Sequence, residues 1–377
     1  MAAIYRHFKI LILLFCGLPL LANAQIPDKS GIQLNDDRSA TFHYYNADVR
    51  KVKVECDCKL KHERIVIKRE SLHKARMQSD GCGNWTYSTP PLAPELYTYR
   101  FRVKNHTIPD PVNPDSIRVN KSKRSIFVVT GTPQADLYVT DSLYGHIDTM
   151  DYISDKKTRR VLVYTPPNYH ASDTLEWPVL YLLHGLNGNE NAWNNRGHVV
   201  QALDNLIRQN RAVPMVLVMP DANPNKLIGQ DEKVGLFKNI LLYPAWEKRE
   251  FERSFSTLDS IIRLRYWVSA RSDLRAVAGL SAGAKQAANI SNIYSNFGTI
   301  GLFSPVLNHR QLPNNSHVRI WIGAGNGDLF HYNVTRYRKK LQRKHITHTL
   351  YPSIGGHTWI NWRYYFTEFV QTIFLKH

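Results

Sequence analysis

The pentapeptide Gly279-Leu280-Ser281-Ala282-Gly283 could place a serine hydroxyl for nucleophilic attack. It joins an apolar run, residues 274–278, to a segment that is compatible with a helix from Ala282 onward. In so sharp a turn, Cβ atoms at the two flanking positions would collide with the neighbouring strand and helix, and glycine on both sides avoids the collision. Ser281 is therefore the candidate nucleophile. The motif alone is a weak signal, because a chain with 20 glycines can contain it by chance.

A serine hydroxyl is a poor nucleophile at neutral pH and needs a histidine base that an acid holds in place. Residues 318–322 predict a buried strand that leads into a glycine-rich segment ending at Asp328, the candidate acid. These glycines lack the spacing and the following helix of a dinucleotide-binding motif. Residues 347–351 predict a further strand that leads to His357, the candidate base. Serine, acid and histidine in this chain order are typical of the hydrolase fold that is built on such a turn.

An apolar run at residues 177–183 predicts a central parallel strand, and it ends in His184-Gly185-Leu186-Asn187-Gly188. Acyl transfer needs backbone amides that stabilise the negative charge on the carbonyl oxygen in the transition state. We expect these donors to be the amide of Ala282, directly after the nucleophile, and the amide of Leu186 in this loop. His184 could act as a second catalytic histidine, but support of the loop is the simpler hypothesis.

With these residues in place, residues 143–377 resemble the esterase D group of α/β-hydrolases, which includes carbohydrate esterase family one. Feruloyl, acetylxylan and siderophore esterases belong to that group. The matching segments in chain order are residues 163–167, 181–185, 189–193, 218–220, the turn around Ser281, 355–359 and 362–363. The resemblance implies an α/β-hydrolase fold with a doubly wound, mostly parallel sheet. The chain departs from the group at Ala284, where a second glycine is usual, and in an oxyanion loop that is poorer in glycine.

Residues 1–24 predict an export signal. Arg6 and Lys9 precede an apolar core at residues 10–21, and Ala22-Asn23-Ala24 supplies a small-residue cleavage site. Cleavage after Ala24 would leave a secreted or periplasmic protein. No later stretch reaches the roughly 18 uninterrupted apolar residues of a membrane span.

Residues 25–128 alternate between apolar and polar side chains in several short runs, which predicts a small all-β sandwich before a linker at residues 129–142. Segments at residues 80–85, 97–99 and 110–113 resemble the immunoglobulin-like E-set modules that precede enzymes acting on polysaccharides. The resemblance leaves two roles open for this domain. It could bind glycan, or it could have a structural or lid-like role.

Three cysteines remain after the predicted cleavage. Cys56 and Cys58 are two residues apart, which places their side chains on one strand face. They could be small buried hydrophobic residues, or one of them could pair with Cys82 in an oxidising compartment. No metal-ligand signature is present in the sequence, so we expect no cofactor and no metal.

The formal net charge of the chain is +18, and its basic residues are spread out, for example at residues 61–68, 121–124 and 336–344. No nucleic-acid-binding motif accompanies them, so no nucleic-acid partner is expected. A solvated basic surface explains the excess. The alternative is steering toward acidic partners, such as glucuronate-bearing glycans or an anionic siderophore.

These features predict a secreted serine carboxylic-ester hydrolase that removes feruloyl or acetyl groups from a plant polysaccharide such as xylan. Two alternatives remain: a siderophore esterase, and a non-catalytic glycan-binding protein on an esterase scaffold. Trp193 follows the oxyanion loop and Trp359 follows His357, so both are candidate substrate-binding residues. As walls of the cleft they would favour a flat aromatic acyl group. Alternatively, they brace their loops.

Overall fold

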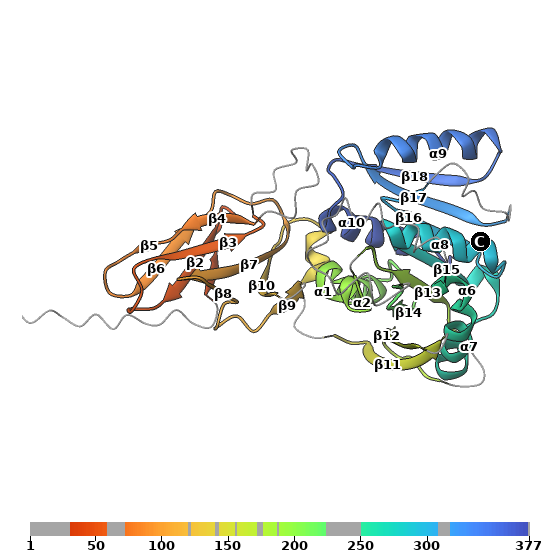
Figure 1. The fold of residues 1–377 in the computed structure, drawn as a ribbon, viewed down its shortest axis with the longest axis horizontal. Coiled ribbons are helices and arrows are strands. Elements are labelled where there is room, and N and C mark those ends of the chain that lie inside the picture. Colours follow the sequence, from red (N-terminus) through yellow and green to blue (C-terminus); the bar gives the residue numbers. More distant parts are fainter. Residues whose placement is uncertain are drawn as a thin grey trace, which may run out of the picture.

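The computed structural model describes residues 31–58, 72–119, 122–139, 143–154, 157–171, 176–186, 188–223, 250–307 and 317–375. A β-rich unit precedes a larger unit of strands and helices (Figure 1). The predicted export signal at residues 1–24 lies outside the described residues, and so does Asn187 of the oxyanion loop. No helix within the described ranges is both long and apolar enough to cross a membrane.

The N-terminal unit contains two antiparallel sheets. The first has the order β1 (Ile32–Leu34), β2 (Ala40–Tyr45), β6 (Asn84–Ser88) and β5 (Gln78–Ser79). The second has the order β4 (His73–Arg76), β3 (Val52–Cys56), β7 (Glu95–Val103), β10 (Ser122–Val129) and β9 (Ser116–Val119), and β8 (His106–Ile108) pairs with β7.

One hydrophobic core joins these two sheets into a sandwich. Phe42 from β2 and Tyr99 from β7 are both fully buried, and their ring centroids lie 5.0 Å apart. The alternation of apolar and polar residues arises because successive side chains on a strand point to opposite faces. The structure differs from both arrangements that the sequence suggested for the cysteines. Cys56 forms a disulfide with Cys58, and Cys82 is free and exposed.

The larger unit has an α/β-hydrolase fold around one eight-stranded sheet. Its strand order is β11 (His146–Ser154), β12 (Lys157–Thr165), β14 (Val216–Pro220), β13 (Val179–Leu183), β15 (Arg275–Leu280), β16 (Thr299–Phe303), β17 (Arg319–Gly325) and β18 (His348–Ser353). The pairs β11·β12 and β12·β14 are antiparallel, and every pair from β14 to β18 is parallel. The central strands are buried along their whole length, because helices cover both faces of a parallel sheet.

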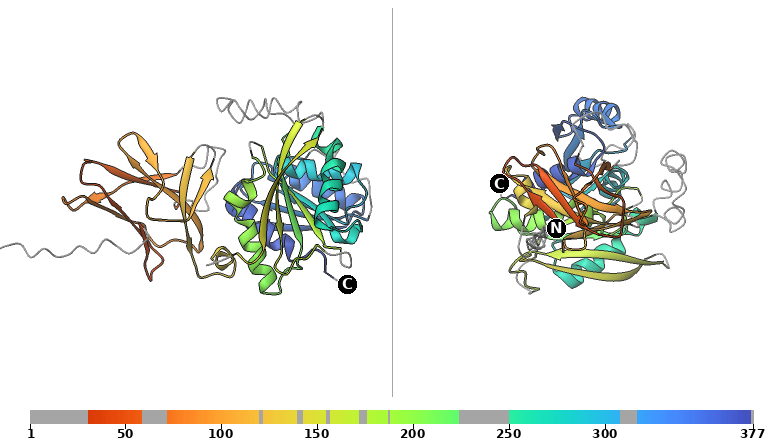
Figure 2. Two further views of the ribbon diagram at one scale, coloured as in Figure 1. Left: turned by 90° about the horizontal axis from the view of Figure 1, so that it is seen from below. Right: turned by 90° about the vertical axis from the view of Figure 1, so that its left-hand side faces the viewer.

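Helices flank this sheet on both faces, as the left-hand view of Figure 2 shows. The helices α1 (Ala192–Gly197), α2 (Val199–Arg208) and α10 (Trp359–Val370) share one hydrophobic core with one face of the sheet. The helices α6 (Glu250–Arg253), α7 (Phe255–Tyr266), α8 (Ala282–Ile293) and α9 (His331–Arg343) share a second core with the opposite face. Alternate residues of β13 divide between the two: Leu180 and Leu182 belong to the first core, and Val179 and Tyr181 to the second.

The two units are in direct contact. The segment predicted as a linker contains a 3-10 helix, η1 (Ala135–Tyr138), whose Leu137 and Tyr138 are buried in the same core as α2 and α10. Leu96 of β7 belongs to that core too. The side-chain amide of Asn205 on α2 donates to the carbonyl groups of Leu137 and Val139, at 2.9 and 3.1 Å.

Candidate active site

Ser281 lies in a strained turn between β15 and α8. Its backbone has φ 54° and ψ −114°, a conformation that residues with a Cβ rarely adopt. A Cβ on Gly279 would lie 2.5 Å from the carbonyl carbon of Gly283, and a Cβ on Gly283 would clash with the carbonyl groups of Leu183 and His184. The crowding expected for a nucleophile elbow is therefore present on both sides of Ser281.

The three residues predicted as a triad lie within hydrogen-bonding distance of one another. The Nε2 atom of His357 is 3.0 Å from the Oγ atom of Ser281. The Nδ1 atom of His357 is 3.3 and 3.2 Å from the two carboxylate oxygens of Asp328. Asp328 follows β17 and His357 follows β18, so both come from the carboxyl ends of strands that run parallel to β15 in the same sheet. Because these ends share one edge of the sheet, they bring the three side chains together.

Asp328 is a buried carboxylate that is well provided with hydrogen-bond donors. Burial by itself acts to raise its pKa, but hydrogen bonds from His357, from the Ser304 hydroxyl and from the Phe330 amide together lower the pKa below the ordinary value. The Asp328 side chain is 1% exposed and the His357 side chain is 18% exposed. Asp328 therefore stays ionised near neutral pH, whereas the base remains open to substrate.

Aromatic rings hold the imidazole of His357 in place. Phe330 and Trp362 each meet it in an edge arrangement, at centroid distances of 5.2 and 4.9 Å. Two exposed apolar side chains lie close in the chain to the acid and the base: Tyr332, near the start of α9, is 68% exposed, and Ile354, directly after β18, is 71% exposed.

Gly185 and Ala282 lie beside the candidate nucleophile. A Cβ on Gly185 would lie 3.4 Å from the Cβ of Ser281, so the loop passes close to the serine. Ala282 is the first residue of α8, and amide groups in the first turn of a helix have no acceptor within that helix. Leu186 directly follows Gly185 in this loop. The loop forms a tight turn, in which the Gly188 amide donates to the Gly185 carbonyl at 3.0 Å.

His184 has both ring nitrogens engaged in the scaffold. The Ala222 amide donates to Nε2 at 3.0 Å, so the ring proton lies on Nδ1, which donates to the Gly185 carbonyl at 2.7 Å. The side chain is 1% exposed. His184 therefore connects the loop to the end of β14, which agrees with the hypothesis that it supports the loop.

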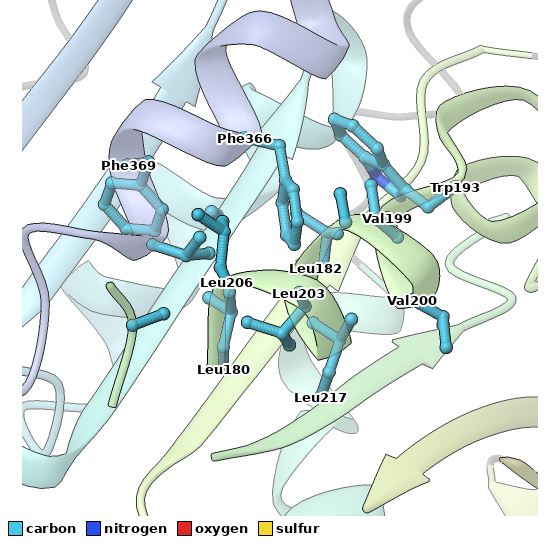
Figure 3. Packing of buried hydrophobic residues seen from close by; sticks show 14 of the residues in the cluster. Leu180, Leu182, Trp193, Val199, Val200, Leu203, Leu206, Leu217, Phe366 and Phe369 are labelled. Carbon is cyan, nitrogen blue, oxygen red and sulfur yellow. The ribbon is translucent and has the colours of Figure 1, made fainter. Parts of the chain in front are cut away.

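Trp193 and Trp359 do not form walls of an open cleft, contrary to the expectation for substrate-binding residues. Trp193 is 0% exposed and its indole N–H donates to the Leu183 carbonyl at 2.9 Å. Its ring packs beside Phe366 and Val199 (Figure 3). Trp359 is 7% exposed and meets the Trp193 ring edge-on at 5.3 Å. Packing of α1 against α10 buries both rings, and their burial fits the alternative that they brace their loops.

Sequence reasoning missed two residues of this site, Ser304 and Trp362. Ser304 follows β16 and is fully buried, and the indole N–H of Trp362 donates to its hydroxyl at 3.1 Å. A serine at the carboxyl end of a predicted parallel strand, next to the strand that carries the nucleophile, is the signal that could have drawn attention to Ser304. Across the described ranges, no cluster of three or more His, Cys, Asp and Glu side chains could hold a metal ion.

Comparison with known proteins agrees with this geometry. Residues 154–373 match the model of the Esterase family, whose description is "Putative esterase". This match covers more than half of the chain, and the protein therefore belongs to the Esterase family. The sheet order and the solved structures below give it an α/β-hydrolase fold.

Among curated proteins, the endo-1,4-beta-xylanase/feruloyl esterase of Xylanibacter ruminicola is 26% identical over 216 residues. The alignment covers 56% of this chain and 28% of that relative, so the chain spans less than a third of its length.

Solved structures share the fold. A ferulic acid esterase from Anaeromyces mucronatus has a TM-score of 0.55 and 21% identity, covering 63% of this chain and 95% of that chain. The enterobactin esterase of Shigella flexneri has a TM-score of 0.58 and 18% identity, covering 94% of this chain and 98% of that chain. At these identities the likeness establishes the fold alone.

Proposed function

We propose that this protein is a serine esterase that works through an acyl-enzyme on Ser281, with His357 as base and Asp328 as its orienting acid. One observation carries the proposal: His357 faces Ser281 with Nε2 at 3.0 Å and faces the buried Asp328 carboxylate with Nδ1. This is the arrangement that activates a serine hydroxyl. The strained conformation of Ser281 supports the same assignment.

In the proposed reaction, Ser281 Oγ attacks the ester carbonyl carbon and His357 Nε2 takes the hydroxyl proton. The amides of Ala282 and Leu186 stabilise the oxyanion of the tetrahedral intermediate. The imidazolium gives its proton to the leaving alkoxide, and the C–O bond of the ester breaks to leave an acyl-enzyme. Water then attacks this intermediate, His357 takes its proton and returns it to Ser281 Oγ, and the carboxylic acid leaves. Asp328 remains a carboxylate throughout.

As substrate we propose a feruloyl or acetyl ester on a plant polysaccharide such as xylan. The curated relative, whose name combines xylanase and feruloyl esterase, supports this choice. The ring of Phe330 beside His357 offers an apolar contact for an aromatic acyl group. A siderophore ester is the second candidate, because the enterobactin esterase fold matches 94% of the chain and so extends over both units.

An assay panel separates these substrates. Methyl ferulate, 4-nitrophenyl acetate and a catecholate trilactone would be compared by kcat/KM, with Ser281→Ala as the control. We expect methyl ferulate to be preferred and Ser281→Ala to lower kcat by about 10⁴ to 10⁶, since a triad acts as a unit. A preference for the trilactone would move the assignment to the siderophore. More than a tenth of wild-type turnover in Ser281→Ala would remove Ser281 from the mechanism, and no turnover of any of the three esters by the wild-type protein would favour the non-catalytic glycan-binding alternative.

We also propose that the chain is exported and that its first 24 residues are removed, which suits an enzyme acting on extracellular polymer. N-terminal sequencing of the protein recovered after expression in a bacterium tests this. Gln25 as the first residue agrees with the proposal, and an intact Met1 in the cytoplasmic fraction contradicts it.

A further inference from the structure

Ser304 has a backbone conformation that is unusual for a serine. Its φ is 48°, in the left-handed region where residues other than glycine are uncommon. Its amide donates to the Gly323 carbonyl at 2.8 Å, which fixes this bend between β16 and β17. The residue is 0% exposed. A buried, strained polar residue beside the candidate nucleophile and acid calls for a functional reason.

The chemistry of its partners sets the direction of both hydrogen bonds to the Ser304 hydroxyl. An indole N–H can only donate, so Ser304 Oγ accepts from Trp362 Nε1 at 3.1 Å. An ionised carboxylate can only accept, so Ser304 donates its single hydroxyl hydrogen to Asp328. A directed chain of hydrogen bonds thus runs from Trp362 through Ser304 to Asp328.

Three donors therefore converge on the Asp328 carboxylate. His357 approaches both oxygens, the Phe330 amide donates to Oδ1 at 2.8 Å, and Ser304 supplies the third bond. Phe330 is two residues from Asp328, so its amide belongs to the same turn as the acid. Ser304 is the donor that reaches Asp328 from a neighbouring strand, and it ties the acid to the sheet.

Trp362 touches both Ser304 and His357. Besides donating to Ser304, its ring meets the imidazole of His357 edge-on at a centroid distance of 4.9 Å. One side chain of α10 thereby connects the orientation of the imidazole with the orientation of the hydroxyl that holds Asp328.

We propose that Ser304 is a positioning residue for the esterase reaction: it holds the Asp328 carboxylate toward His357, and Trp362 orients its hydroxyl. This inference rests on the proposed function. Ser304 touches neither substrate nor reacting atoms, so it acts through Asp328. Its loss should lower kcat, because the acid no longer keeps the imidazole aligned, and should leave KM nearly unchanged.

The test uses Ser304→Gly, which removes the hydroxyl and at the same time suits the left-handed backbone. We expect kcat on 4-nitrophenyl acetate to fall about 10- to 100-fold, with KM within about threefold of wild type. Trp362→Phe, which keeps a ring and removes the indole donor, should lower kcat less. Ser125→Gly is the matched control, since Ser125 is an equally buried serine in the N-terminal sandwich, and it should leave kcat unchanged.

A second background separates positioning from a general structural role. In the Asp328→Asn background, adding Ser304→Gly should lower kcat by a further factor of less than about three. The reason is that the carboxylate through which Ser304 acts is already altered. An undiminished kcat in Ser304→Gly, or an equal loss in both backgrounds, would overturn the role of Ser304 and leave the proposed function standing. Wild-type activity in Ser281→Ala would overturn the proposed function and the role of Ser304 together.

Discussion

Asp328 shows how single residues define this site. Its carboxylate is buried, yet its pKa is lowered, because the donors around it outweigh the effect of burial. A group whose pKa is lower in the folded state stabilises the fold above its unfolded pKa, and that contribution disappears as the pH falls through the folded value. Asp328 therefore keeps its charge as the pH falls below neutral, and its carboxylate stays available to orient His357.

Asp328→Asn should lower kcat on the order of 10⁴-fold while the fold remains native, because an amide favours the wrong tautomer of His357. The measurement is kcat on 4-nitrophenyl acetate, with circular dichroism to check the fold. A loss below tenfold would assign the role to another carboxylate.

The buried His198 should make the free energy of unfolding depend on pH. It lies between α1 and α2 with φ 48°, and its Nε2 atom is buried. Burial, together with the positive charge of Arg363, lowers the pKa of His198 to about 3, from an ordinary value of 6.5. Between about pH 3 and pH 6.5, His198 thus binds a proton in the unfolded chain but not in the folded chain. With respect to His198, the free energy of unfolding is therefore greatest above about pH 6.5 and decreases as the pH falls toward 3.

His198→Asn should weaken this dependence, because asparagine accepts the left-handed backbone and does not titrate. At pH 4 the wild-type protein should have lost roughly 2 to 3 kcal/mol of unfolding free energy through His198, and the variant should retain it. Urea melts of both proteins at pH 7 and pH 4 measure the difference. The same loss in both proteins would show that His198 does not cause it.

At the scale of elements, the elbow depends on how closely α8 approaches β13. A Cβ on Gly283 would point at the carbonyl groups of Leu183 and His184, at the end of β13. These are backbone atoms, which cannot move aside as the end of a flexible side chain can.

Gly283→Ala should therefore shift α8 away from β13, with a stability loss of about 1 to 3 kcal/mol and at least a tenfold drop in kcat. Thermal melts and initial rates on 4-nitrophenyl acetate measure both effects. Wild-type melting temperature and rate in this variant would mean that the elbow has more room than its geometry indicates.

The same scale explains what the sequence could predict. Continuous apolar runs in the sequence predict the buried strands, and the predicted strand ends lie within a few residues of the observed ones. The run at residues 177–183, for example, corresponds to β13 at Val179–Leu183. The proximity of Ser281, Asp328 and His357 could be predicted as well, because each follows such a strand and the carboxyl ends of parallel strands meet at one edge.

Other features depend on packing between segments that are distant in the chain. Trp193 and Trp359 are buried by contact between α1 and α10, and nothing next to either residue encodes that contact. Ser304 joins the site through Trp362, 58 residues away. Local periodicity reports which face of an element is apolar, but it does not report which element covers that face.

At the scale of the whole molecule, the N-terminal sandwich is tied to α10, the helix that follows the candidate base His357. Arg363 of α10 is 5% exposed and donates to the Glu95 carboxylate at 2.9 Å and to the Leu96 carbonyl at 3.1 Å, both on β7. It also donates to the Arg196 carbonyl of α1 at 3.0 Å. One buried guanidinium thus joins the sandwich to two helices that flank the active site, which favours a structural role for the N-terminal unit.

Glu95→Gln tests this connection, because it removes the charge and keeps the shape of the side chain. Arg363 would remain buried without its counter-charge, and loss of one partner of a buried pair is far more costly than loss of an exposed one. We expect a loss of about 3 kcal/mol in unfolding free energy, measured by urea denaturation. Asp151→Asn is the matched control: Asp151 pairs with Arg160 at 2.8 Å, but both side chains are about half exposed, and the expected loss is below about 1 kcal/mol. If the two variants lost equal stability, Arg363 would not hold the units together, and contacts among Leu96, Leu137 and Tyr138 would have to account for the junction.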